Sequence, residues 1–124
     1  MKNNKILEPS IDEKGFVYLL GDFEKPGIYK IGVTRGSIAR RIKKLQTGNS
    51  GEIYVCKYYR TDYPFFIEKH LHNKYNSKNI LNEWFELDEE EFKNFEKTCE
   101  FYENLIDAMK DNPFFLKKLN KTYL

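Results

Sequence analysis

The sequence contains few cysteines and no long apolar run. Its 124 residues include two cysteines, Cys56 and Cys99, which form no CxxC pair. A structural zinc site needs four ligands at close spacing, so a zinc-stabilised fold is set aside and both thiols are expected to be packing residues. No segment has the length and hydrophobicity of a membrane span, and no signal peptide is visible. These absences favour a cytoplasmic protein in a reducing compartment, with no membrane partner.

The composition predicts one domain with a modest core. Hydrophobic residues make up 40% of the chain and aromatic residues 16%, so Phe and Tyr must fill much of that core. The net charge of +2 hides an asymmetry. Residues 25–60 carry nine Lys and Arg against one acidic residue, whereas residues 83–107 carry ten Asp and Glu against two lysines. The first segment would attract a polyanion and the second would repel one.

Residues 16–46 carry the clearest pattern. Two runs rich in β-branched and aromatic residues, 16–20 and 28–34, flank a connection with Gly, Asp and Pro, which predicts a β-hairpin. A helix is expected directly afterwards, because Ser37 suits an N-cap and apolar residues follow at the spacing of one helical face. This helix should end near Gly48, which suits a left-handed C-cap.

The rest of the chain predicts short alternating elements. Pro64 soon after Asp62 indicates a helix start, and Asn112-Pro113 should break the last long helix. In chain order we expect a loosely docked tail at 1–14, a strand at 53–59, a helix from Asp62 to Tyr75, a polar loop at 76–82, a short strand or edge at 83–87, a helix from Asp88 onwards, and a short helix at 114–119.

Arginines on the first predicted helix are candidates for a phosphate contact. On a helical wheel with about 100° per residue, Arg41 lies at the rim of the apolar stripe, whereas Arg40 points to the far side. A side chain at that rim is positioned and partly desolvated, and the planar guanidinium suits phosphate oxygens. The alternative, which charge alone favours, is a solvated basic helix. Tyr18 and Lys30 on the hairpin also have ordinary alternatives, a packed tyrosine and a solvent-facing lysine.

Glu68 and His72 are four residues apart on the second predicted helix, so they face the same way. Glu68 lies near the margin of the apolar stripe of that helix. One carboxylate at such a rim can hold Mg²⁺ if waters and substrate phosphates supply the remaining ligands. The alternative is a surface Glu–His pair, which is the commoner meaning of this spacing.

These pieces form one ordered set, which also includes two motifs at the ends of predicted elements. In chain order the set is Val17-Tyr18, Lys30-Ile31-Gly32, Arg41 followed by Leu45-Gln46-Thr47-Gly48-Asn49, Glu68 with His72, and Glu83-Trp84-Phe85. In order and spacing it resembles the GIY-YIG nuclease superfamily, closest to small phage- or virus-borne members with KIG in place of YIG. Gly27-Ile28-Tyr29 spells the first motif but lies directly before Lys30, so Tyr18, a hairpin's length upstream, takes the role of the first-motif tyrosine.

The resemblance implies an α/β (α+β) fold with a three-stranded antiparallel sheet flanked by helices. It covers a nuclease domain at 15–88, with an N-terminal tail at 1–14 and a C-terminal helical extension at 89–124. It also implies an endonuclease, a hydrolase that cuts phosphodiester bonds of DNA with one Mg²⁺ or Mn²⁺ and leaves 5′-phosphate and 3′-hydroxyl ends. The expected partner is nucleic acid, DNA before RNA. Because one small domain should bind DNA weakly, a protein partner or a homodimer is also expected.

The resemblance assigns roles to four residues in particular. Glu68 would be the metal ligand, and Arg41 would stabilise charge on the phosphate. Tyr18, supported by Lys30, would deprotonate or position the attacking water. Many members have a second tyrosine where this chain has Lys30, so the general base is either Tyr18 or Lys30. Supporting or substrate-binding positions are Arg35, Arg40, His72 and Glu83.

Two alternatives stay open at this point. The loop before the first helix is one residue longer than is common in the family, which makes Arg40 an alternative to Arg41, although the helical wheel and the register of the LQTGN motif favour Arg41. The function could also be a non-catalytic nucleic-acid-binding module, or a partner-binding regulator that acts through the acidic C-terminal helix. The presence of all four candidate catalytic residues favours the enzyme.

Overall fold

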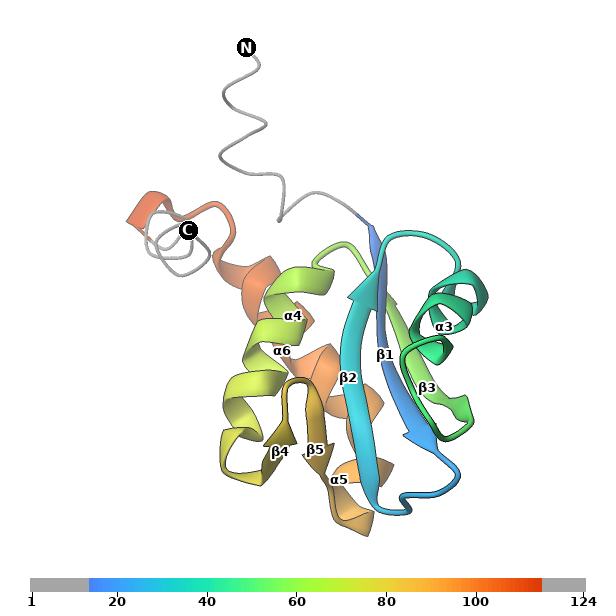
Figure 1. Cartoon of the computed structure of the whole chain (residues 1–124). Coiled ribbons are helices and arrows are strands. Elements are labelled where there is room, and N and C mark those ends of the chain that lie inside the picture. The colour runs from blue at the N-terminus through green and yellow to red at the C-terminus, as the bar shows by residue number, and fades with distance from the viewer. Residues whose placement is uncertain (1–13, 115–124) are drawn as a thin grey trace.

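The computed structural model describes residues 14–114, which form a mixed α+β fold around an antiparallel sheet. Within these residues the sheet has five strands in the order β3-β1-β2-β5-β4. Helix α3 lies over one face of the sheet, α6 lies behind it, and α4 runs alongside β2 (Figure 1). In chain order the elements are β1 (Gly15–Asp22), β2 (Ile28–Thr34), α3 (Ile38–Gln46), β3 (Ile53–Thr61), α4 (Pro64–Lys74), the 3₁₀ turn η1 (Asn76–Lys78), β4 (Asn79–Leu81), β5 (Trp84–Glu86), α5 (Glu89–Lys93) and α6 (Phe95–Met109).

The alternation of side chains along β1 divides the core into two parts. Val17 and Leu19 join the main core, together with buried residues of α4 and α6. Tyr18 and Leu20 point to the opposite face, where apolar side chains of α3 pack against them. A strand places successive side chains on opposite faces of its sheet, so one strand supplies both the central packing and the floor beneath α3.

Helix α6 is held by apolar and polar contacts. Its carboxylate Glu103 accepts hydrogen bonds from the hydroxyls of Tyr59 and Thr61 on β3. Part of the acidic segment at 83–107 therefore ties α6 to the sheet. The buried residues that α6 adds to the main core are Phe95, Cys99 and Ile106.

The α+β class is confirmed, but the prediction of three strands is wrong. The two further strands, β4 and β5, form a hairpin that pairs with one end of β2. β5 lies inside the predicted edge at 83–87. β4 lies in the segment predicted as a polar loop, because it pairs through its backbone and follows no apolar alternation. The turn between the two strands contains Asn82 at φ 51, a left-handed conformation that asparagine tolerates.

The helix predicted from Asp88 onwards is in fact two helices. α5 begins with a capping box, in which Asp88 and Glu91 each accept a hydrogen bond from the other's backbone amide. The chain then breaks at Asn94 before α6 begins. The apolar spacing continues through the break, so the sequence pattern does not reveal it.

Only the N-terminal end of α3 agrees with the prediction. The hydroxyl of Ser37 accepts a hydrogen bond from the Arg40 amide, as an N-cap does. At the other end the C-cap is Thr47 in a right-handed conformation, and Gly48 does not have the positive φ expected of it. The left-handed C-cap is therefore a wrong prediction.

Some predictions fall outside the described residues. These are the tail at 1–14 except for Lys14, and the helix at 114–119 except for Phe114. The boundary between residues 88 and 89 stays a prediction. In the part of the chain that the structure describes, every helix is too short or too polar to cross a membrane.

Candidate functional site

Tyr18 and Arg41 meet between β1 and α3. The Nε of Arg41 donates a hydrogen bond to the Tyr18 hydroxyl over 3.3 Å. Tyr18 is only 1% exposed, and its neighbour across the sheet is Gly32. A Cβ at Gly32 would lie 2.5 Å from the Tyr18 hydroxyl, so the tyrosine ring lies against the bare backbone there. The glycine of the KIG motif thus makes the space in which Tyr18 reaches Arg41.

Lys30 lies next to this pair on the same face of β2. Residues 30 and 32 are two apart on one strand and therefore share a face. The ammonium of Lys30 forms an ion pair with Glu83 at 3.2 Å, and it lies 5.7 Å from the centroid of the Trp84 ring. The Lys30 side chain is only 14% exposed. The lysine is thus fixed in place by the strand hairpin that the three-stranded prediction omitted.

Glu68 and His72 reach the site because β5 covers only half of the β2 edge. β5 pairs with residues 28–30 of β2, and α4 is bonded to the strand at the next residue, Ile31. There the backbone of Ile31 receives two partners, because its amide donates to the Glu83 carbonyl and its carbonyl accepts from His72 Nε2 at 3.0 Å. A carbonyl only accepts hydrogen bonds, so Nε2 of His72 carries a proton. His72 therefore attaches α4 to β2, with Glu68 one turn earlier on the same side of the helix.

Burial dominates the electrostatics of Glu68. Its side chain is 19% exposed, and its pKa is raised to about 7, chiefly by burial. This value includes a smaller increase from the nearby carboxylate of Glu83 and decreases from Lys30 and Arg41. Glu68 Oε2 lies 3.9 Å from Nε2 of His72. This carboxylate is close enough to sense both cations, yet it is half protonated near neutral pH in the absence of a further positive charge.

The Tyr18 phenol is also shaped by burial. Desolvation raises the pKa of Tyr18, and the hydrogen bond and positive charge of Arg41 only partly oppose that effect. The tyrosine is therefore neutral at physiological pH. Its oxygen accepts from Arg41, so its own proton is available to a ligand.

The other predicted residues lie farther out. Arg35 is exposed and its guanidinium stacks on Phe65 at 4.7 Å, at the start of α4. Arg40 is exposed on α3, while Arg41 is half-buried. Tyr29 points to the opposite face of β2, where its ring packs 5.0 Å from that of Phe92. The structure thus brings together six of the eight predicted residues: Tyr18, Lys30, Arg41, Glu68, His72 and Glu83.

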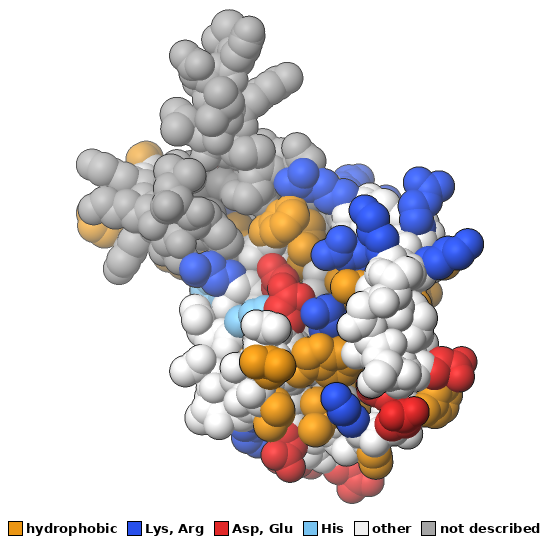
Figure 2. Space-filling view, in the orientation of Figure 1, with side chains coloured by type: hydrophobic (Ala, Val, Ile, Leu, Met, Phe, Trp, Pro, Cys, Tyr) orange, Lys and Arg blue, Asp and Glu red, His pale blue; other side chains and the backbone are white. Residues whose placement is uncertain are grey.

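Charge is unevenly distributed around this site. Figure 2 shows Lys and Arg side chains gathered over α3, with acidic and histidine side chains beside them in the middle of the same face. Further acidic side chains lie at the lower end of the view, below the basic region. The basic region over α3 would attract a polyanion to this face.

The loop after α3 is held by a network that sequence reasoning missed. The amide nitrogen of Gln46 donates to the carbonyls of Asn49 and Gly51, and its amide oxygen accepts from the Ile53 amide. Asn49 in turn donates to the buried carboxylate of Asp22 at 2.9 Å. This hydrogen bond and one from the Glu24 backbone hold the pKa of Asp22 below its usual range. The Gln and Asn of the LQTGN motif therefore fix the loop. The sequence feature that could have indicated this network is Asp22, a charged residue at the otherwise apolar end of β1.

A divalent cation at this site would have one protein carboxylate as its ligand. Among residues 14–114, no cluster of three or more His, Cys, Asp and Glu side chains could enclose a metal ion. Glu68 nevertheless offers hard oxygen atoms in a half-buried position. Mg²⁺ commonly binds through one or two carboxylates and completes its shell with water and phosphate oxygens. The donor chemistry therefore fits a weakly held Mg²⁺ or Mn²⁺.

Comparison with known proteins identifies a family. The model of the T5orf172 domain matches residues 15–100, which is more than half of the chain and includes every residue of the site described above. No significant match to a curated protein or to a solved structure was found. The chain therefore belongs to the T5orf172 domain family, a phage-type family associated with nuclease-like proteins related to the GIY-YIG group.

Proposed function

We propose that the protein is a metal-dependent endonuclease that hydrolyses phosphodiester bonds of DNA by a one-metal GIY-YIG mechanism. The observation that carries this proposal is the convergence of a guanidinium, an ammonium, a phenol and a carboxylate from four different elements at one exposed face. A phosphodiester needs cations for its charge, and its hydrolysis needs a positioned water. Family membership supports a nuclease-like role.

Arg41 and Lys30 would bind the phosphate. The contact with Tyr18 uses only Nε of Arg41, which leaves the two terminal nitrogens to donate to two phosphate oxygens. Lys30 would act as a point charge held in place by Glu83 and Trp84. Both cations are fixed before substrate arrives, which is the arrangement that stabilises charge developing in a transition state.

Glu68 would hold the divalent cation. Bound there, Mg²⁺ or Mn²⁺ would supply positive charge to the phosphate and lower the pKa of a coordinated water. His72 supports Glu68 by fixing α4 to the backbone of Ile31. Glu83 would keep Lys30 oriented through their ion pair. It would therefore contribute to phosphate binding indirectly, without contacting the substrate.

Tyr18 would position the attacking water as a hydrogen-bond donor or acceptor. Its raised pKa disfavours the phenolate, so proton abstraction by Tyr18 requires help from a bound cation. Lys30 is paired with the carboxylate of Glu83, and an ammonium has no lone pair with which to accept a proton. Of the two candidates for general base, Tyr18 is the better placed, because its hydroxyl is already polarised by Arg41.

Adjacent arginines provide a matched test of this proposal. Arg41→Ala should lower metal-dependent cleavage of plasmid or oligonucleotide DNA by roughly 10²-fold or more, since removing one preorganised donor to a developing charge has an effect of that order. Arg40→Ala removes the same charge from an exposed position of the same helix and should change the rate by less than about threefold. The measurement is single-turnover cleavage with Mg²⁺ or Mn²⁺ against a chelator control, and the expected product ends are 5′-phosphate and 3′-hydroxyl.

Other outcomes identify the rival functions. Equal losses in the two variants would mean a solvated basic helix without a fixed phosphate contact. DNA binding with no metal-dependent cleavage in the wild type would favour a non-catalytic binding module. RNA of the same sequence, assayed in parallel, decides between the two nucleic acids.

A further inference from the structure

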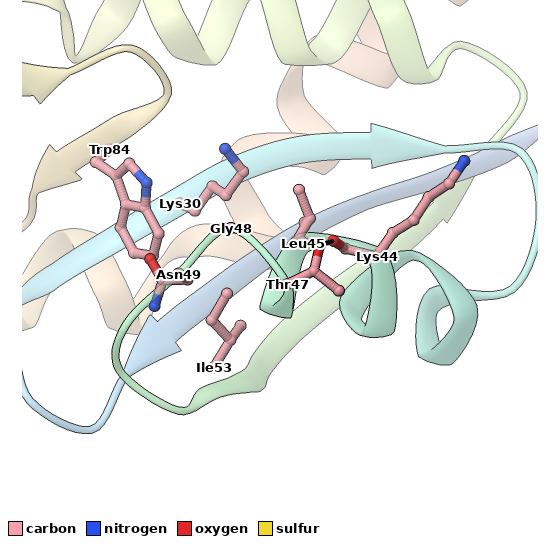
Figure 3. Close-up of a pocket in the computed structure, with 8 residues that line it drawn as sticks. All are labelled: Lys30, Lys44, Leu45, Thr47, Gly48, Asn49, Ile53 and Trp84. Carbon is pink, nitrogen blue, oxygen red and sulfur yellow. Dashed lines mark hydrogen bonds between the residues drawn. The ribbon is translucent and has the colours of Figure 1, made fainter.

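A cavity of about 280 Å³ opens beside the proposed catalytic residues, on the α3 face of the sheet. One wall is formed by Lys30 of β2 and Trp84 of β5, and the other by the loop that follows α3 (Figure 3). Lys30 therefore borders both the cavity and the proposed phosphate site.

The loop wall is rigid. Gln46 makes three hydrogen bonds that close the loop, and Asn49 is tied to the buried Asp22. Gly51 lies close against Asp22, because a Cβ there would lie 2.2 Å from Asp22 Oδ1. A wall built in this way keeps its shape before a ligand arrives, which lowers the entropic cost of binding.

Gly48 is the one glycine of this wall that the fold itself does not require. Its φ is not positive, and the nearest atom to a Cβ there would be the Leu45 carbonyl oxygen at 4.0 Å. A side chain would therefore fit at Gly48 without strain. Its absence leaves the cavity wall as bare backbone on the side facing Trp84 and Lys30.

The opposite wall offers a planar surface. Trp84 pairs with Lys30 across β2 and β5, so the backbone position of the indole is fixed by the sheet. Lys30 adds positive charge to the cavity, and Thr47 and Asn49 add polar atoms at its margin. An aromatic plane combined with cations and a few polar groups is the combination with which proteins bind the bases of single-stranded nucleic acid.

We propose that this cavity binds one unpaired nucleobase of the strand that is cut, next to the scissile phosphate, by stacking on Trp84. The proposal rests on the proposed function and specifies its substrate class. The volume of about 280 Å³ is near the lower limit of ligand pockets, roughly 300 Å³, a size that suits one small planar group. In a continuous duplex both faces of each base are covered by its neighbours, so the preferred substrate has a bulge, a flap, a loop or an end that presents an unstacked base.

Trp84 is the only tryptophan of the chain and reports directly on the cavity. Three dye-labelled DNAs are titrated into the full-length protein with EDTA to prevent cleavage: a blunt duplex, the same duplex with one unpaired nucleotide, and the same duplex with an abasic residue at that position. The unpaired base should quench the tryptophan fluorescence and bind roughly tenfold more tightly than the abasic duplex, as expected for one base stacked on an aromatic side chain. Equal affinity for the unpaired and abasic duplexes, without quenching, would overturn the proposal.

Two matched leucine substitutions test whether the unpaired base binds in this cavity. Gly48→Leu should reduce the affinity for the unpaired-base duplex to that of the abasic duplex, because the new side chain lies at the wall of the cavity. Gly36→Leu places the same side chain on a loop where a Cβ meets nothing within 4 Å, and it should bind like the wild type. Retained discrimination between base and abasic site in Gly48→Leu would show that the base binds elsewhere.

The outcomes separate this proposal from the proposed function. Metal-dependent cleavage without discrimination between unpaired base and abasic site would leave the endonuclease intact and overturn the base site. Discrimination and quenching without cleavage under any metal condition would support the base site and overturn the endonuclease.

Discussion

Replacing Gly32 by alanine should both destabilise the protein and abolish cleavage. The added Cβ would lie 2.5 Å from the Tyr18 hydroxyl and 2.7 Å from its Cε1 and Cζ atoms. The ring is 1% exposed and packed within the cluster beneath α3, so it cannot move aside freely. Overpacking of this kind costs about 1–3 kcal/mol. Any shift of the ring that relieves the clash also moves the Tyr18 hydroxyl away from Arg41. Cleavage should therefore be lost even where the variant remains folded.

Gly36→Ala is the matched control for this prediction, because a Cβ at Gly36 meets nothing within 4 Å. It should leave the free energy of unfolding within about 0.5 kcal/mol of the wild type. In a Tyr18→Ala background, Gly32→Ala should cost little, since the clashing ring is absent. Urea denaturation is measured for the wild type, the three single variants and the double variant, and a wild-type stability for Gly32→Ala would contradict the packing of Tyr18 described above.

Replacing Glu68 by glutamine should stabilise the metal-free protein above neutral pH. Folding raises the pKa of Glu68 from the ordinary 4.5 to about 7. A carboxyl whose pKa is raised contributes stability that is fully present below pH 4.5 and is lost as the pH rises through 7. The interval corresponds to at most about 3 kcal/mol. The neutral glutamine removes this penalty, so the variant and the wild type should be alike at pH 4.5 and should differ most at pH 8.

Glu52→Gln controls for the change of net charge, because Glu52 is exposed and lies directly before β3. It should show no comparable gain at pH 8. Mg²⁺ or Mn²⁺ should raise the melting temperature of the wild type at pH 8 but not that of Glu68→Gln, because the bound cation compensates the buried carboxylate. A Glu68→Gln protein that is less stable than the wild type at pH 8 would mean that Glu68 makes a structural ion pair instead.

The elements nearest the site were predictable because local patterns specify them. The β1–β2 hairpin follows from two apolar runs around a turn, and the start of α3 follows from the Ser37 cap. The alternation along β1 separates Tyr18 from Leu19, and the face of α3 separates Arg41 from Arg40. The two residues of each pair lie on the same short element, and the periodicity of that element determines the side to which each one points.

The parts that escaped prediction depend on pairing between distant segments. β4 is three residues long and has no apolar alternation, so only its pairing with β5 makes it a strand. The break at Asn94 lies between two helices with continuous apolar spacing. Gly48 has no left-handed φ because Thr47 ends α3 and side-chain hydrogen bonds from Gln46 and Asn49 shape the turn in place of a glycine cap.

The site itself was partly predictable. Six of the eight candidate residues come together in the structure. All six belong to sequence motifs whose order along the chain indicates them. Trp84 stood in a motif but had no assigned role, because the cavity exists only once β5 is placed against β2 and beside the loop after α3. The distribution of charge along the sequence does not indicate this cavity, because its walls are made of backbone, an indole and two lysines from different segments.

The most direct test of the proposed active site is single-turnover cleavage of a DNA duplex with one unpaired nucleotide by the wild type, Glu68→Gln and Glu52→Gln. All three are compared at pH 8 with Mg²⁺ or Mn²⁺, after denaturation curves have shown that each is folded. If Glu68 holds the metal ion, the wild type and Glu52→Gln should show metal-dependent cleavage and the more stable Glu68→Gln should show none, as this assignment requires. Cleavage by Glu68→Gln at the wild-type rate would contradict it.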